Sequence, residues 1–167
     1  MTERYGTTAG FKVYHNERGN VATIADLTDT EIDSSILVAS EWIDNTYRNL
    51  WPGEKLGQRK QIRDWPRSSA FDVNKDPIDY DTVPIEIERA TYEAALKNAV
   101  SPGSLSVDFT PSRYQIVSVE DAIFVQYRTF TQAADIQTRF TIIDNILSVL
   151  LSGGNSLSPL SGLVKRV

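Results

Sequence analysis

The stretch that decides the fold is residues 28–47, TDTEIDSSILVASEWIDNTY. Apolar residues recur in it at helical spacing and predict one buried face of a helix over 30–47: Ile32, Ile36, Ala39, Ile43 and Tyr47. Thr28 or Asp29 can cap this helix, and acidic residues in its first turn suit the positive end of the helix dipole. Trp42 flanks the apolar face. We therefore expect a long amphipathic helix that packs one side against a core.

A second long helix is predicted from Pro84 to about Ala99, because proline is favoured in a first helical turn and Pro102-Gly103 can end the helix. Its expected buried residues are Ile87, Ala90, Ala94 and Leu96, and its expected exposed residues are Glu86, Glu88 and Glu93. A shorter helix is predicted over 55–64, since Pro66 disfavours helical geometry at Trp65. Residues 68–83 are predicted to form an exposed loop.

The two flanks of this helical region are predicted to differ from it. Residues 1–27 are interpreted as a polar leader that can hold one short strand, Phe11–Tyr14. Alternating apolar and polar residues predict a β-hairpin at about 114–130. The expected fold is mainly α: a small helical bundle over 28–151, with this hairpin and an extended C-terminal tail over 152–167.

The last predicted helix, about 138–151, is apolar on nearly all of its faces. Such a helix must be buried on several sides, and a neighbouring subunit is a natural source of that cover. The residues expected to form the subunit interface are Ile142, Ile146, Val149 and Leu150. The tail after it has turn-forming residues early and no acidic residue from Asn155 onward. Its expected partner-binding residues are Leu157, Leu160, Leu163, Val164, Lys165 and Arg166.

Composition excludes several classes of protein. The 167 residues include no cysteine, so neither disulfides nor thiolate chemistry is available. No run of about 18 uncharged apolar residues occurs, so no membrane span is expected. The first ten residues lack the apolar stretch of a secretory signal, which favours synthesis in the cytoplasm. The net charge of −5 argues against nucleic-acid binding over the whole surface.

No enzyme, cofactor or metal site is predicted. His15 is the only histidine, and without a Gly-x-Ser-x-Gly elbow it is expected to be structural or solvated. Asp72-Val-Asn74-Lys-Asp76 has the acidic spacing that opens a calcium loop. Pro77 and Val83, however, stand where that loop needs a glycine and a bidentate glutamate, so a solvated loop is expected. No glycine-rich phosphate-binding motif is present.

Residues 42–67 have the most unusual composition of the chain, with six basic residues, three acidic residues and all three tryptophans. Two interpretations are open. Basic residues interleaved with aromatic rings can bind single-stranded DNA, because bases stack on the rings. Alternatively, the tryptophans anchor the core and the arginines form ion pairs or subunit contacts. The second interpretation gives Trp42, Trp65, Pro66 and Arg67 a structural role.

The order of three motifs resembles a known family. The sequence Gln61-Ile-Arg63-Asp-Trp65-Pro66-Arg67 follows a helix bearing Ala39-Ser-Glu41-Trp42-Ile43-Asp44-Asn-Thr-Tyr47. It precedes a helix that starts Val83-Pro84 and contains Ala90-Thr-Tyr92-Glu93-Ala94-Ala95. Together with Tyr14-His15-x-x-Arg18-Gly19-Asn20, this order resembles a family of tailed-phage proteins found between the portal and tail genes. The resemblance covers about residues 11–100.

Two functions are attached to that family. One is a structural head–tail connector, or adaptor, which forms a ring, usually of twelve copies, beneath the portal. The resemblance then implies a place in the virion neck, the portal and a downstream tail or neck protein as partners, and portal binding by the C-terminal tail. Duplex DNA would pass through the lumen without specific binding, which an acidic chain suits. The alternative is a DnaT-like single-stranded-DNA-binding protein that uses residues 42–67.

Overall fold

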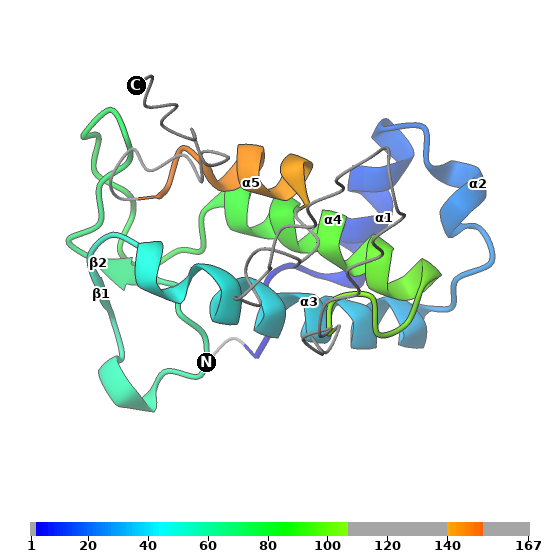
Figure 1. Ribbon diagram of the computed structural model, residues 1–167, viewed down its shortest axis with the longest axis horizontal. Helices are drawn as coiled ribbons and strands as arrows, with labels where there is room; N and C mark the ends of the chain where they lie inside the picture. Colours follow the sequence, from blue (N-terminus) through cyan, green and yellow to red (C-terminus); the bar gives the residue numbers. More distant parts are fainter. Residues whose placement is uncertain (1–2, 107–139, 152–167) are drawn as a thin grey trace, which may run out of the picture.

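The computed structural model describes residues 3–106 and 140–151 (Figure 1). These residues form five α-helices: α1 (Thr8–Glu17), α2 (Val21–Ile24), α3 (Asp29–Tyr47), α4 (Ile85–Val100) and α5 (Thr141–Leu147). They also form two short 3₁₀ turns, η1 (Arg48–Leu50) and η2 (Gln58–Lys60), and an antiparallel pair of strands, β1 (Glu54–Lys55) and β2 (Arg67–Ser68). The predicted mainly α fold with a small hairpin is confirmed. The hairpin predicted at 114–130 and the C-terminal tail lie outside the described residues.

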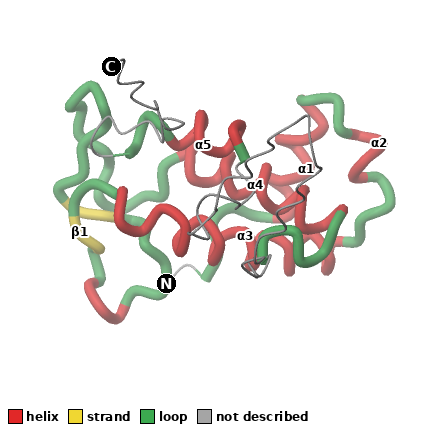
Figure 2. The backbone as a smooth tube through the Cα atoms, in the orientation of Figure 1, coloured by secondary structure: helices red, strands yellow, loops and turns green. Residues whose placement is uncertain are grey.

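Helices α3 and α4 pack against each other and form the centre of the molecule (Figure 2). The predicted apolar face of α3 is buried as expected, and each of its five residues is at most 2% exposed. Thr28 is the N-cap. Its side chain accepts a hydrogen bond from the Glu31 amide, while the Glu31 carboxylate accepts one from the Thr28 amide at 2.8 Å. This reciprocal capping box explains why the helix begins where the sequence predicts.

Helix α4 lies between α3 and α5 (Figure 1). Ile87, Ala90 and Ala94 are fully buried as predicted, and Leu96 is partly buried against the core. The expected exposure of Glu93 is wrong, because its side chain is only 8% exposed. Its carboxylate accepts a hydrogen bond from the Tyr14 hydroxyl at 2.9 Å, a contact that the sequence of α4 alone cannot reveal.

The N-terminal segment belongs to the packed body. The predicted strand over 11–14 is wrong, because these residues lie inside α1. Thr7 caps α1 by accepting a hydrogen bond from the Gly10 amide at 3.0 Å. The segment contributes four fully or almost fully buried side chains to the core: Tyr5, Phe11, Tyr14 and His15. Phe11, Tyr14 and His15 lie on α1, which packs against α3 and α4, and Tyr5 precedes that helix.

The predicted helix over 55–64 is also wrong. These residues begin in β1, make one 3₁₀ turn at η2 and then run without regular structure to β2. The side chain of Gln61 bonds backbone groups of this segment that a helix would have paired with one another. It accepts from the Gly57 amide at 2.8 Å and donates to the carbonyls of Arg63 and Pro66, each at 2.9 Å.

His15 has the structural role that was one of its two expected roles. It is fully buried, and its Nε2 lies 3.1 Å from the Tyr92 carbonyl, to which it can only donate. Its Nδ1 then accepts from the Asn20 amide group at 3.1 Å. The neutral ring satisfies both contacts, whereas a second ring proton would face the Asn20 donor. Burial lowers the pKa of His15.

Acidification should therefore destabilise the protein through His15. A lowered pKa in the folded state means that the unfolded chain takes up this proton first. The contribution of His15 is thus complete above about pH 6.5 and is lost as the pH falls below it. The difference in unfolding free energy between wild type and His15→Gln, measured by urea titration, should shrink between about pH 7.5 and pH 5. A difference that stays constant over this range would contradict the assignment.

Candidate functional site

The motif Asp64-Trp65-Pro66-Arg67 lies at one end of the body, where α3 gives way to the β1–β2 hairpin (Figure 1). Asp64 and Trp65 are fully buried, and Arg67 is 9% exposed. The peptide bond between Trp65 and Pro66 is cis. The motif therefore lies mostly in the interior, where its residues contact the surrounding loops.

The Asp64 carboxylate forms ion pairs with two cationic side chains at this end of the body. It lies 3.2 Å from the Arg48 guanidinium and 2.5 Å from the Lys55 ammonium. Both cationic side chains come from the surface and bring their charged groups to a buried acid, which would otherwise carry an uncompensated charge. Two of the six basic residues of segment 42–67 are thus already paired.

Asp44 is the second buried acid at this end of the body, and the sequence did not single it out as a site residue. One carboxylate oxygen accepts from the Tyr5 hydroxyl at 2.5 Å and from the Asp64 amide at 3.3 Å. The other lies 3.5 Å from the Arg63 guanidinium. The Tyr5 hydroxyl in turn accepts from the Trp65 amide at 3.0 Å. Burial raises the pKa of Asp44 and of Tyr5.

Arg63 and Arg67 are used as internal cross-links. Arg63 is 5% exposed, and its guanidinium donates to the Glu3 carbonyl and lies 3.4 Å from the Glu41 carboxylate. Arg67 donates to the carbonyls of Pro52 and Gly53, each at 2.6 Å, and to that of Asp64 at 3.3 Å. Burial lowers the pKa of Arg67. Planar guanidinium groups suit such multiple contacts.

The tryptophans behave as the core-anchor interpretation predicts. Trp65 is fully buried and meets Trp51, itself 5% exposed, edge to face at 5.8 Å between ring centroids. Trp42 is partly buried against the core and lies edge to face with Phe140 at 5.5 Å. Buried rings cannot stack on bases, so Trp51 and Trp65 cannot contribute to a surface that binds single-stranded DNA.

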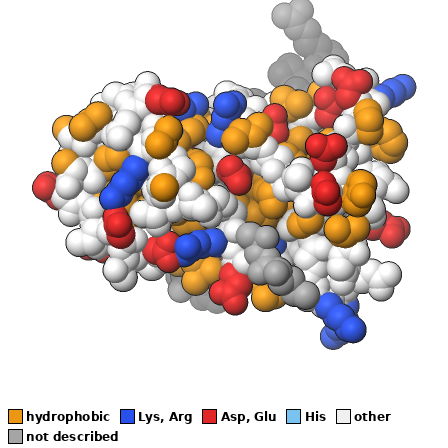
Figure 3. Space-filling view, turned by 180° about the vertical axis from the view of Figure 1, so that it is seen from behind, with side chains coloured by type: hydrophobic (Ala, Val, Ile, Leu, Met, Phe, Trp, Pro, Cys, Tyr) orange, Lys and Arg blue, Asp and Glu red, His pale blue; other side chains and the backbone are white. Residues whose placement is uncertain are grey.

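The basic residues that remain at this end are on one loop. We call residues 56–62 the basic projection: they run from Leu56 through η2 to Ile62 and carry Arg59 and Lys60, both exposed. In the reversed view of Figure 3, basic side chains protrude at the lower right corner, where this loop lies. Elsewhere on that face, basic side chains alternate with acidic and apolar ones.

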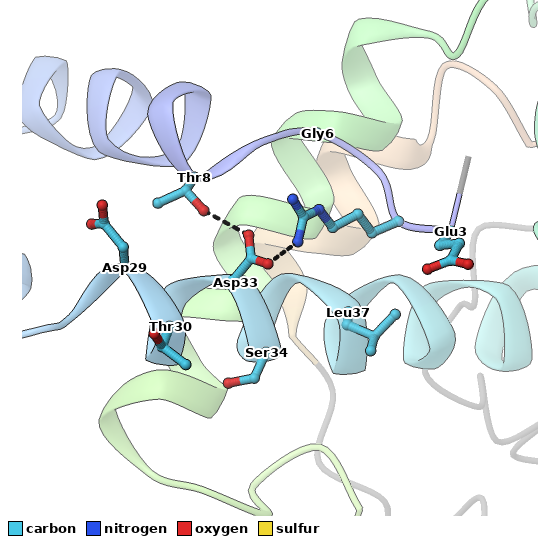
Figure 4. A pocket seen from close by; sticks show the side chains of 9 residues that line it. Glu3, Gly6, Thr8, Asp29, Thr30, Asp33, Ser34 and Leu37 are labelled. Carbon is cyan, nitrogen blue, oxygen red and sulfur yellow. Dashed lines mark hydrogen bonds and ion pairs between the residues drawn. The ribbon is translucent and has the colours of Figure 1, made fainter. Parts of the chain in front are cut away.

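An open surface pocket of about 850 Å³ lies along the N-terminal half of α3 (Figure 4). We call it the acidic pocket, because its lining includes the carboxylates of Glu3, Asp29 and Asp33. Asp33 accepts from the Thr8 hydroxyl at 2.8 Å and pairs with Arg4. These hydrogen bonds lower the pKa of Asp33.

The residues predicted to form a subunit interface divide into two groups. Leu150 is buried and Ile146 is partly buried within the chain itself. Ile142 and Val149 are 45% and 39% exposed and remain available to another molecule. The residues predicted to bind the portal, 157–166, lie outside the described residues.

The predicted solvated loop at 72–76 is closed by the side chain of its first residue, Asp72. The Asp72 carboxylate accepts from the amides of Asn74 and Asp76 at 2.8 and 2.9 Å. Within residues 3–106 and 140–151, no three His, Asp or Glu side chains are grouped as metal ligands. In the same residues, no helix is long and apolar enough to cross a membrane.

Comparison with known proteins gives one finding. A protein-family model described as "Putative DnaT-like ssDNA binding protein" matches residues 2–164, nearly the whole chain. No curated protein and no solved structure gives a significant match.

Proposed function

The chain belongs to the family described as "Putative DnaT-like ssDNA binding protein", and within that family we propose that it is a structural head–tail connector that forms a ring under the portal and joins it to the tail. The observation that carries this proposal is the burial of the basic and aromatic motif. Arg63, Trp65 and Arg67, which would make the centre of a DNA-binding surface, are each at most 9% exposed.

The charge balance of the remaining surface supports the same function. Segment 42–67 carries six basic and three acidic residues, a net charge of +3, so the rest of the chain carries −8 to give the total of −5. Within the segment, Arg48 and Lys55 are held by Asp64. A mainly acidic surface suits a lumen through which duplex DNA passes without being gripped.

Exposed apolar side chains favour contacts with other proteins. Four apolar side chains are 39–54% exposed: Ile142 on α5, Val149 in the turn after it, and Phe71 and Val73 on the neighbouring loop. The loop is joined to the turn after α5 by a hydrogen bond from the Val73 amide to the Val149 carbonyl at 3.0 Å. Solvent-exposed apolar groups that gather in this way are typical of protein interaction sites.

The family resemblance supplies the partners. The motif order around Trp65 resembles that of adaptors docked beneath a portal, which implies a ring, usually of twelve copies, in the virion neck. The portal above and a tail or neck protein below would be its partners. We propose the C-terminal tail as the portal-binding element, through Leu157, Leu160, Leu163, Val164, Lys165 and Arg166.

Truncation after Gly154 tests this proposal. The shortened protein should keep the circular dichroism spectrum of the full chain, because the described core lies within residues 3–151. It should lose co-sedimentation with the portal, since the tail supplies the backbone and side-chain contacts. A truncated protein that binds the portal as tightly as the full chain would contradict the assignment of the tail. A full-length chain that does not bind the portal at all would contradict the connector function.

Single-stranded-DNA binding is the second candidate function, and the family description favours it. Arg59 and Lys60 are exposed, whereas Arg48, Lys55 and Arg63 pair with buried carboxylates and Arg67 donates to backbone carbonyls. Binding through so few cations should fade steeply with salt. In the same experiments, a complex with single-stranded DNA that survives physiological salt and quenches tryptophan fluorescence would favour this function over the connector.

A further inference from the structure

The basic projection, residues 56–62, is held in a defined shape. Gln61 bonds three backbone groups across it, and the Leu56 amide donates to the Pro66 carbonyl at 3.3 Å. The Lys60 amide also donates to the Gly57 carbonyl at 3.2 Å. A loop ordered by its own hydrogen bonds loses little conformational entropy when it binds.

The exposed side chains of this loop have one chemical character. Arg59 and Lys60 are exposed, and no acidic residue occurs between Leu56 and Ile62. Leu56 and Ile62 are 46% and 55% exposed, although both are large apolar side chains. A binding partner for this loop should therefore offer carboxylates together with some apolar surface.

The acidic pocket offers both. Its lining holds three carboxylates and one guanidinium, that of Arg4, and the side chains of Asp29 and Asp33 stay 75% and 42% exposed although they pair with Lys12 and Arg4. Leu37, 39% exposed, supplies an apolar wall. Residues 26–33 contain four acidic residues and no basic one, so this surface keeps a net negative charge when Arg4 and Lys12 are counted with it.

We propose that the basic projection of one copy of this chain docks into the acidic pocket of a second copy. No residue of the projection lines the pocket of its own chain. The projection follows the C-terminal end of α3, whereas the pocket lies along its N-terminal half (Figures 1 and 4). The contact is thus head to tail, and such contacts join copies into a closed ring or an open filament.

A second copy explains more of these features than a nucleic acid does. Phosphates would account for Arg59 and Lys60 but would leave the apolar side chains of Leu56 and Ile62 exposed. Complementary charges between copies also orient the encounter, so association should weaken as salt rises. The proposal concerns contacts between copies alone and does not require the portal.

Two charge-reversed variants of the full chain test the contact. Variant one is Arg59→Glu with Lys60→Glu, and variant two is Glu3→Lys with Asp29→Lys. Each should associate with itself at least about tenfold more weakly than wild type in sedimentation velocity, because like charges then meet. Mixed one to one, the two variants should associate again, since each reversed loop meets a reversed pocket and each native loop a native pocket.

The matched control reverses two exposed cations elsewhere, Lys75→Glu with Arg89→Glu, and should associate as wild type does. Circular dichroism melts of all variants check that each is folded. Three results would each overturn the proposal. Wild type could stay monomeric at high concentration, variant one or variant two could associate by itself as wild type does, or the mixture of the two could stay monomeric. If Ile142→Ser with Val149→Ser abolishes association while variant one does not, the interface is at α5 and the turn that follows it. None of these outcomes depends on portal binding, so the connector function is tested separately.

Discussion

Trp65→Ala should lower the free energy of unfolding by roughly 3–5 kcal/mol. The Trp65 side chain is fully buried, packs edge to face on Trp51 and sits where its backbone amide donates to the Tyr5 hydroxyl. Removal of the indole leaves a cavity between the end of α3 and the hairpin, and the hydrogen-bonded backbone around it limits collapse. The measurement is urea or thermal unfolding followed by circular dichroism.

Trp65→Phe is the matched control. The Trp65 indole nitrogen has no hydrogen-bond partner among the described residues, so the smaller ring loses volume but no polar contact. It should cost clearly less than the alanine variant. An unchanged melting midpoint in Trp65→Ala together with lost binding to single-stranded DNA would instead indicate that the ring serves recognition.

Asp44→Ala should be similarly destabilising, by roughly 3–5 kcal/mol, because it removes one partner of a buried ion pair. The Asp44 side chain is 3% exposed and the Arg63 side chain 6% exposed. Without the carboxylate, the Arg63 guanidinium keeps only the exposed Glu41 as a charged partner. The Tyr5 hydroxyl and the Asp64 amide also lose their acceptor.

Glu41→Ala is the control on the same arginine. Its carboxylate lies 3.4 Å from the Arg63 guanidinium, close to the distance of Asp44, but its side chain is 57% exposed. Solvent screens such a pair, so its loss should cost at most about 1 kcal/mol. Equal losses in the two variants would show that burial is not what makes the Asp44 contact strong.

These effects, if found, place the Trp-Pro-Arg motif in the architecture of the chain and not on its binding surface. Its arginine donates to backbone carbonyls that precede each strand of the hairpin, and its aspartate forms ion pairs with two cationic side chains. These hydrogen bonds and ion pairs hold the end of the body from which the basic projection extends. Substitutions in the motif should therefore change stability, whereas substitutions at Arg59 and Lys60 should change binding.

Local features of the chain were predictable from the sequence. The face of α3, its cap at Thr28 and the start of α4 after Pro84 follow from helical periodicity and capping chemistry, which act within a few residues. The burial of Trp65 was one of two open interpretations, and the structure confirms it. The absence of cysteine and the acidic net charge were read directly from the residues.

Contacts between distant residues were decided by the tertiary structure alone. Phe11–Tyr14 carries too weak a pattern to separate strand from helix, and its packing on α3 and α4 makes it helical. Residues 55–64 could form a helix locally, but Gln61 and the pairing of β1 with β2 hold them as a loop. Tyr5, Asp44 and Asp64 are separated by 39 and 20 residues and form one hydrogen-bonded cluster. Sequence periodicity describes one element at a time, so it cannot show which buried charges from different elements will meet.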